Sequence, residues 1–270
     1  MPILKAFAIA IRNNKPQMRY ALPAMPILSR CFLDETMVLM VFQGHRMNQN
    51  QEVLLIPMDE LKEELNNDRF RVAIFGSARL KEDTPEYYQV FNLARLVASA
   101  EIDLVTGGGP GLMEAASRGF YEGKENASIR SIGLNIRLPN EQRFAAHLDV
   151  KREFELFSER LNSFVDLSNA FVVTPGGIGT ILELFYTWQL AQVKQIADKP
   201  LILMGDMWMD LLKWMRVWPL KNNLLDEADL DLVYLTKDYV EAFTVVQESY
   251  NDFMSGGTQF CRTYQKYRPW

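Results

Sequence analysis

Residues 174–183 read TPGGIGTILE, and they decide the fold class of this 270-residue chain. An apolar run at 170–173 leads into this stretch, and a segment with helical apolar spacing at 182–193 leads out of it. That order predicts a strand, a glycine turn and a helix. Glycines let the backbone approach a ligand closely, and the amides of a helix start attract an anion such as a phosphate. The alternative is that the loop is only a tight connection between strand and helix.

Two further turns follow apolar runs in the same way. Residues 106–111, TGGGPG, follow the run at 102–105, and residues 76–79 follow the buried-strand pattern at 70–75. Ligands of open α/β sheets lie beyond the carboxyl ends of the strands, so we expect the three turns to line one crevice.

From residue 69 onward, strands alternate with helices. This pattern predicts a Rossmann-like α/β fold, a doubly wound parallel sheet with helices on both faces. The predicted strands are 70–75, 102–105, 129–136, 170–174, 200–204 and 232–235. The first predicted helix begins at Pro85, and the others cover 112–121, 152–167, 182–193, 206–217 and 239–250.

We expect one nucleotide-binding domain, 69–255, between two segments of less certain structure. Residues 1–68 form an N-terminal extension of unknown role, and residues 256–270 form a C-terminal tail. The extension contains β-like runs at 36–42 and 52–56 and a short helical pattern at 58–65.

The composition narrows the function classes. The net charge is −5 and the pI is near 5.3, which disfavours a nucleic acid as the partner. Two cysteines, Cys31 and Cys261, lie far apart and indicate free thiols in a reducing cytoplasm. Two histidines, His45 and His147, are too few to favour a histidine-based metal site, and we expect both to be bystanders. No stretch approaches the ~20 apolar residues of a membrane span, so we expect no membrane partner.

Two charged residues are candidates for chemistry. Arg160 lies in the predicted helix 152–167, where its guanidinium could bind phosphate or ribose oxygens or form an ordinary surface ion pair. Glu183 follows Gly179 by one helical turn, and a place near a helix start predicts an ionised carboxylate. Such a group suits stabilising a positive sugar-like transition state or orienting a water, and helix capping is the alternative. The chain has no P-loop and no complete dinucleotide fingerprint, so ATP hydrolysis and nicotinamide redox chemistry have little support.

Several ordered motifs resemble the LOG ("Lonely Guy") family. Residues 175–183, PGGIGTILE, resemble its PGGxGTxxE signature, and residues 107–116, GGGPGLMEAA, resemble its GGGPGxMEAA segment. Residues 75–79, FGSAR, and 131–142, SIGLNIRLPNEQ, resemble its bacterial branch. The resemblance covers about residues 70–217.

The resemblance implies a nucleoside 5′-monophosphate phosphoribohydrolase. Such an enzyme hydrolyses the N-glycosidic bond of AMP or of a related cytokinin-type purine nucleotide to a free base and ribose 5-phosphate. The catalytic pair of the family falls on Arg160 and Glu183. The implied substrate-binding residues are Gly76, Ser77, Gly107, Gly108, Gly109, Met113, Gly176, Gly177, Gly179 and Thr180. The resemblance also implies no metal or other cofactor, and a cytoplasmic homodimer or larger homo-oligomer with the apolar segment 154–164 as a candidate interface.

The chain departs from the family pattern at two positions. Arg160 is followed by Leu161 where the family commonly has lysine, and Leu182 stands where many relatives have an acidic residue. The missing positive charge keeps a second hypothesis open, a nucleotide sensor or carrier with weak or no catalysis. A third, a DNA-handling protein, is disfavoured by the acidic pI. Members of this family have often been labelled lysine decarboxylase, but no lysine here stands in a pattern expected for pyridoxal phosphate.

Overall fold

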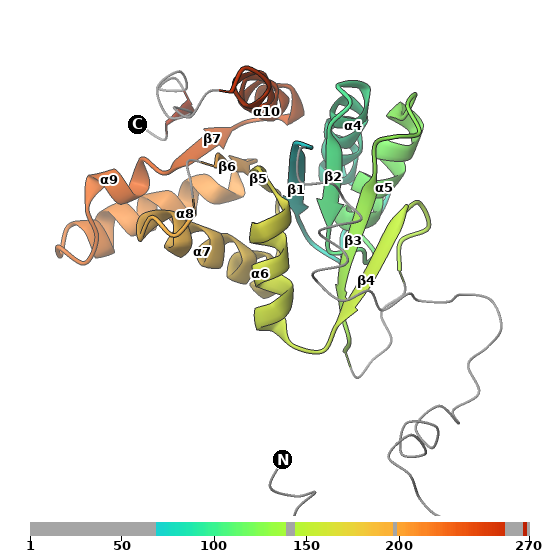
Figure 1. Cartoon of the computed structure of the whole chain (residues 1–270). Coiled ribbons are helices and arrows are strands. Elements are labelled where there is room, and N and C mark those ends of the chain that lie inside the picture. The colour runs from blue at the N-terminus through green and yellow to red at the C-terminus, as the bar shows by residue number, and fades with distance from the viewer. Residues whose placement is uncertain (1–68, 139–143, 197–198, 257–266, 269–270) are drawn as a thin grey trace, which may run out of the picture. The chain divides into compact units, whose positions relative to one another are not determined.

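The structure is a computed structural model, and it describes residues 69–138, 144–196, 199–256 and 267–268. The elements predicted in the N-terminal extension fall outside these residues, as do Cys31, His45 and Cys261. The described chain forms a sheet of seven strands whose neighbours all pair in parallel (Figure 1). The predicted fold class, a Rossmann-like parallel α/β sheet, is confirmed.

The strand order is β4-β3-β2-β1-β5-β6-β7. The chain therefore builds the sheet outward from β1 in one direction and then returns to build it in the other, so the order reverses between β1 and β5. The strands are β1 (Arg71–Phe75), β2 (Asp103–Thr106), β3 (Ser131–Ile136), β4 (Val150–Phe154), β5 (Ala170–Val173), β6 (Leu201–Met204) and β7 (Val233–Thr236). A ligand site is expected where the order reverses, beyond the carboxyl ends of these strands.

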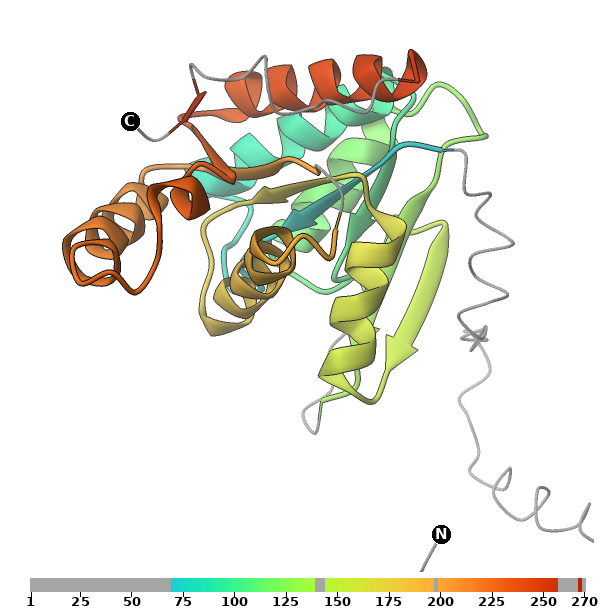
Figure 2. The ribbon, with the colours of Figure 1, turned by 60° about the vertical axis from the view of Figure 1, so that its left-hand side comes forward.

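Helices cover both faces of the sheet (Figure 2). Successive strand residues point to opposite faces, so Val72 and Ile74 of β1 lie in one apolar core and Ala73 and Phe75 in the other. One core contains α4 (Pro85–Ser99), α5 (Leu112–Gly123) and α10 (Tyr239–Met254). The other contains α6 (Phe157–Leu167), α7 (Ile178–Gln192), α8 (Met207–Met215), the π-helix η1 (Arg216–Leu220) and α9 (Glu227–Leu230).

The largest difference from the sequence-based prediction is the edge strand β4. Residues 152–154 were expected to begin a helix, but they pair with β3, and α6 begins only at Phe157. Val150 and Phe154 are buried, whereas Lys151, Arg152 and Glu153 between them are half-buried. An edge strand with one neighbour tolerates charged side chains. Because these charges interrupt the apolar run, the sequence pattern did not predict a strand here. The short α9 was also not predicted.

Candidate active site

Backbone hydrogen bonds hold the three turns after β1, β2 and β5 together. The amide of Ser77 donates to the carbonyl of Pro175 at 3.1 Å, and the amide of Leu112 donates to the carbonyl of Ser77 at 2.8 Å. Gly111, with φ of +72°, lies so close that a Cβ there would come within 2.4 Å of the Ser77 carbonyl oxygen. The loop after β1 is therefore fixed between the two glycine turns.

A cavity of about 510 Å³ opens above these turns. It brings together most of the residues that the sequence singled out, namely Gly76, Ser77, Gly107, Met113, Arg160, Gly177, Gly179, Thr180 and Glu183. Gly108, Gly109 and Gly176 are not among its lining residues. Gly108 packs on the backbone of Gly133, and Gly176 packs on the side chain of Thr180, so these two glycines shape the turns from behind.

The remaining lining residues were not predicted as site residues. They are Ala78, Arg79, Ile136, Leu138, Phe157 and Ile178. Most are apolar, and they lie at or just after the ends of β1 and β3 or at the starts of α6 and α7, which is the edge of the sheet where ligands bind. Their place beyond strand ends was the signal that could have identified them. The apolar residues of this set, together with Met113, provide an apolar wall beside a polar floor.

The polar floor is the start of α7. This helix begins at Ile178, four residues earlier than the sequence pattern indicated, with Gly177 at its N-cap. No described side chain caps it, and the first amides of any α-helix lack partners within the helix. A Cβ added at Gly177 or Gly179 would meet no atom within 4 Å. The turn is thus open on its cavity side, as an anion site requires.

Gly179→Ala tests this open turn. Gly179 lies in the first turn of α7, where alanine favours the helix by up to about 1 kcal/mol. We therefore expect an unchanged or higher melting temperature. The added methyl group would stand in the cavity, so we expect weaker AMP binding by calorimetry, whereas Gly76→Ala should lower stability because its Cβ would lie 2.4 Å from Thr174 Oγ1. Normal AMP affinity in Gly179→Ala would place the anion elsewhere.

Arg160 and Glu183 form a buried ion pair at the cavity. Nη1 of Arg160 donates to Oε1 of Glu183 at 2.9 Å, and Nε donates to the carbonyl of Leu134 at 2.7 Å. The guanidinium also stacks over the ring of Phe164, 4.9 Å from its centroid. Arg160 is 8% exposed and Glu183 is 7% exposed, so the alternative of a surface ion pair does not hold. The carboxylate of Glu183 is therefore held in position by Arg160, which is itself held by the Leu134 carbonyl and the Phe164 ring.

Burial raises the pKa of Glu183, and Arg160 only partly offsets this effect by its charge and hydrogen bond. This direction is opposite to the one that a helix start alone would cause. Because α7 begins at Ile178, Glu183 lies beyond its first turn, where the dipole has largely faded and loss of solvent dominates. A carboxylate with a raised pKa is a stronger base, which suits proton transfer from water.

Other chemistries find less support among the described residues. No lysine is among the described residues that line the cavity. The half-buried Lys199 donates to the carbonyl of Val165 instead. His147 stacks on Tyr121, apart from the cavity. In the part of the chain that the structure describes, no cluster of three or more histidine, cysteine or acidic residues could hold a metal ion. None of the described helices is long and apolar enough to span a membrane.

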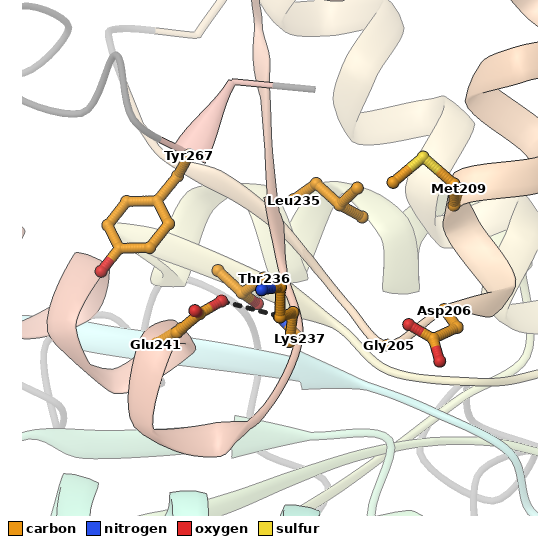
Figure 3. Close-up of a pocket in the computed structure, with 8 residues that line it drawn as sticks. All are labelled: Gly205, Asp206, Met209, Leu235, Thr236, Lys237, Glu241 and Tyr267. Atoms are coloured by element: carbon orange, nitrogen blue, oxygen red, sulfur yellow. Dashed lines mark hydrogen bonds between the residues drawn. The ribbon is translucent and has the colours of Figure 1, made fainter. Parts of the chain in front are cut away.

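A second cavity, of about 390 Å³, lies beyond the ends of β6 and β7. Figure 3 shows Leu235 and Met209 extending toward each other across it. Polar groups also line it, and the Lys237 amide donates to Glu241 Oε2 at 2.9 Å. None of the site residues expected from the sequence lines this second cavity, which separates it from the Arg160–Glu183 pair.

A family model described as possible lysine decarboxylase matches residues 113–246. This region includes nearly all of α5, the whole of α7, and the Arg160–Glu183 pair. A nucleotide 5′-monophosphate nucleosidase is 28% identical over half of the chain. The chain belongs to the LOG family. The label lysine decarboxylase has no counterpart in the LOG-type cavity, which lacks a lysine among its described lining residues.

Curated relatives of this LOG protein include a pyrimidine/purine nucleotide 5′-monophosphate nucleosidase from Escherichia coli strain K12. It is 28% identical over 143 residues, which cover 50% of this chain and 30% of that protein. The protein of the same name from E. coli O157:H7 matches equally. The match thus spans less than a third of the length of these relatives.

Solved structures share the fold of this LOG protein. The molybdenum cofactor binding protein from the phototrophic bacterium Rippkaea orientalis has a TM-score of 0.52 and 19% identity, over 67% of this chain and 96% of that one. The molybdenum cofactor carrier protein from Chlamydomonas reinhardtii has a TM-score of 0.50 and 20% identity, over 68% and 99%. At these identities the likeness concerns the fold alone.

Proposed function

We propose that the protein hydrolyses the N-glycosidic bond of a purine nucleoside 5′-monophosphate such as AMP, or a cytokinin-type relative, to a free base and ribose 5-phosphate. One observation carries this proposal: the buried Arg160–Glu183 pair faces the same cavity as the open amides of Gly177 and Gly179. An anion site and a basic carboxylate in one cavity suit a substrate with a phosphate at one end and a reactive sugar carbon near it. The relationship to a nucleotide 5′-monophosphate nucleosidase supports the same class of substrate.

In this mechanism the chain provides binding, a base and shielding from solvent. The start of α7 binds the 5′-phosphate, and the apolar wall around Phe157 and Ile136 receives the purine. As the bond between C1′ and the base nitrogen breaks, its electrons leave with the base and C1′ becomes positive. The Glu183 carboxylate stabilises that charge and takes a proton from the attacking water, whose oxygen bonds to C1′. The departing base takes up a proton from solvent and Glu183 later returns its proton to solvent, so that one water is consumed. Arg160 holds the carboxylate in place through the 2.9 Å hydrogen bond.

Incubation of the full chain with AMP tests the proposal. We expect adenine and ribose 5-phosphate in equal amounts. Chromatography measures the base, and an enzymatic assay measures the sugar phosphate. Release of inorganic phosphate and adenosine would instead show a phosphatase. Tight AMP binding without any product would support the alternative, a sensor or carrier.

The alternative rests on the missing family lysine, and the structure weakens that reason. Leu161 is 6% exposed and is not among the residues that line the cavity. Because position 161 is buried and does not belong to the described lining, the leucine removes no charge from that lining. Leu182, the other departure, is exposed and also does not line the cavity.

Leu161→Lys tests whether the missing lysine limits activity. The variant buries an ammonium group and gives up the apolar contacts of Leu161, so we expect a loss of about 2–3 kcal/mol in the free energy of unfolding. We expect no gain in kcat/KM for AMP. Chemical denaturation and steady-state kinetics check the two expectations, and an increase in kcat/KM of tenfold or more would revive the lysine as a missing functional group.

We further propose that the protein forms a homodimer through the outer face of α7. Ile178, Leu182 and Phe185 are exposed and recur at helical spacing on this helix, with Ile178 83% exposed. The segment 154–164 contributes less surface than its sequence indicated, because Phe154, Leu161 and Phe164 are buried within the chain itself. Light scattering tests the proposal: a monomer for the full chain, or a dimer that survives Leu182→Glu with Phe185→Glu, would contradict it.

A further inference from the structure

Among the residues that the structure describes, three with charged side chains line the cavity, namely Arg79, Arg160 and Glu183. The charges of Arg160 and Glu183 neutralise each other, because the two side chains form an ion pair. Nε of Arg160 donates to the carbonyl of Leu134. The guanidinium of Arg160 is also packed against Gly107, where an added Cβ would lie 2.5 Å from Nη2. The net positive charge of the described part of the lining therefore resides on Arg79.

Arg79 has a fixed base and an exposed side chain. Its amide donates to Oγ of Ser77 at 3.1 Å, and Ser77 in turn bonds to Pro175, next to the glycine turn of α7. Among the residues that the structure describes, no carboxylate pairs with the Arg79 guanidinium. An arginine that projects from a rigid loop beside a helix start is placed to bind the same anion as the helix amides.

We propose that Arg79 binds the 5′-phosphate of the substrate together with the start of α7, and so makes the site selective for phosphorylated nucleosides. This proposal rests on the proposed function for the identity of the ligand. A phosphate dianion then meets an arginine fork on one side and the amides of residues 178–180 on the other. Arg79 supplies from the loop after β1 the charge that the family lysine was expected to supply from α6.

Calorimetric titration with ribose 5-phosphate tests the proposal without requiring catalysis. We expect Arg79→Gln to weaken binding by about 10- to 100-fold, because a charge-assisted hydrogen bond is lost, with an unchanged melting temperature. Arg79→Lys should recover part of the affinity, since it keeps the charge and loses the fork. The matched control is Lys81→Gln, which removes the same charge from the same exposed loop but does not line the cavity, and it should bind within twofold of the wild type.

Three results would overturn the assignment: equal affinity of Arg79→Gln and the wild type, an equal loss in Lys81→Gln, or no binding of ribose 5-phosphate by the wild type. The test is separable from the proposed function. If the wild type binds ribose 5-phosphate in an Arg79-dependent way but leaves AMP intact, the phosphate site stands and the hydrolase proposal fails. If AMP is cleaved but Arg79→Gln binds and reacts normally, hydrolysis stands and the role of Arg79 is wrong.

Discussion

Glu183→Gln is expected to lower kcat for AMP hydrolysis by about a thousandfold, because an amide cannot take a proton from water. The side chain keeps its size and can still accept the hydrogen bond that Arg160 donates at 2.9 Å in the native pair. Nucleotide binding should therefore persist. Steady-state kinetics and calorimetry with AMP, together with a thermal melt, separate loss of chemistry from loss of fold.

The matched control is Glu159→Gln. Glu159 lies next to Arg160 on α6 but is exposed, and it does not line the cavity. The substitution makes the same change in charge close to the site, so its kcat should stay within a factor of two or three of the wild type. Full activity in Glu183→Gln, or equal losses in both variants, would remove Glu183 from the chemistry.

Arg160→Met is expected to affect stability as well as activity. It leaves the carboxylate of Glu183 buried without its partner, and breaking a buried pair in this way costs about 3–5 kcal/mol. Activity should fall at least a hundredfold, because an unheld carboxylate no longer faces the reacting carbon. Arg130→Met, which removes an exposed arginine outside the cavity, should leave both properties near wild type.

The loss of stability in Arg160→Met should depend on pH in a defined direction. Burial raises the pKa of Glu183 and Arg160 lowers it, so removing Arg160 raises the pKa further. Between its unfolded and folded pKa values the carboxyl group binds more protons in the folded state, and stability therefore falls as the pH rises through this window. Urea denaturation at pH 5 and pH 8 should show the larger loss at pH 8.

The double variant Arg160→Met with Glu183→Gln provides the control for this reasoning. It removes both charges, so it should recover much of the stability lost in Arg160→Met alone. An equal loss at both pH values, together with no recovery in the double variant, would mean that Arg160 acts through packing on Phe164 and not through its charge.

The sequence predicted most of the fold because the decisive elements are apolar and periodic. The strand at 170–173 and the helix from Pro85 were identified correctly, since buried parallel strands read as short apolar runs. The edge strand β4 was missed because Lys151, Arg152 and Glu153 carry no apolar pattern. The early start of α7 was missed because glycine is a poor helix former and the first turn of this helix contains one.

The sequence indicated most of the residues that share the candidate cavity, but not the electrostatics of that cavity. The order of the strands brought Arg160 and Glu183 to one cavity, as the resemblance implied, yet 23 positions separate them in sequence. No periodicity indicates that they form a buried pair, or that burial raises the pKa of Glu183. Arg79 is part of the FGSAR motif at 75–79, but the motif does not indicate a role for its charge. That role follows from the place of Arg79 in the cavity lining.

The most direct test of the central claim is a crystal structure of Glu183→Gln with AMP. The account predicts the phosphate against the amides of residues 178–180, the purine on the apolar wall at Phe157, and C1′ facing the side chain at position 183. AMP bound in the second cavity, beside Asp206 and Tyr267, or bound with its sugar turned away from residue 183, would contradict it.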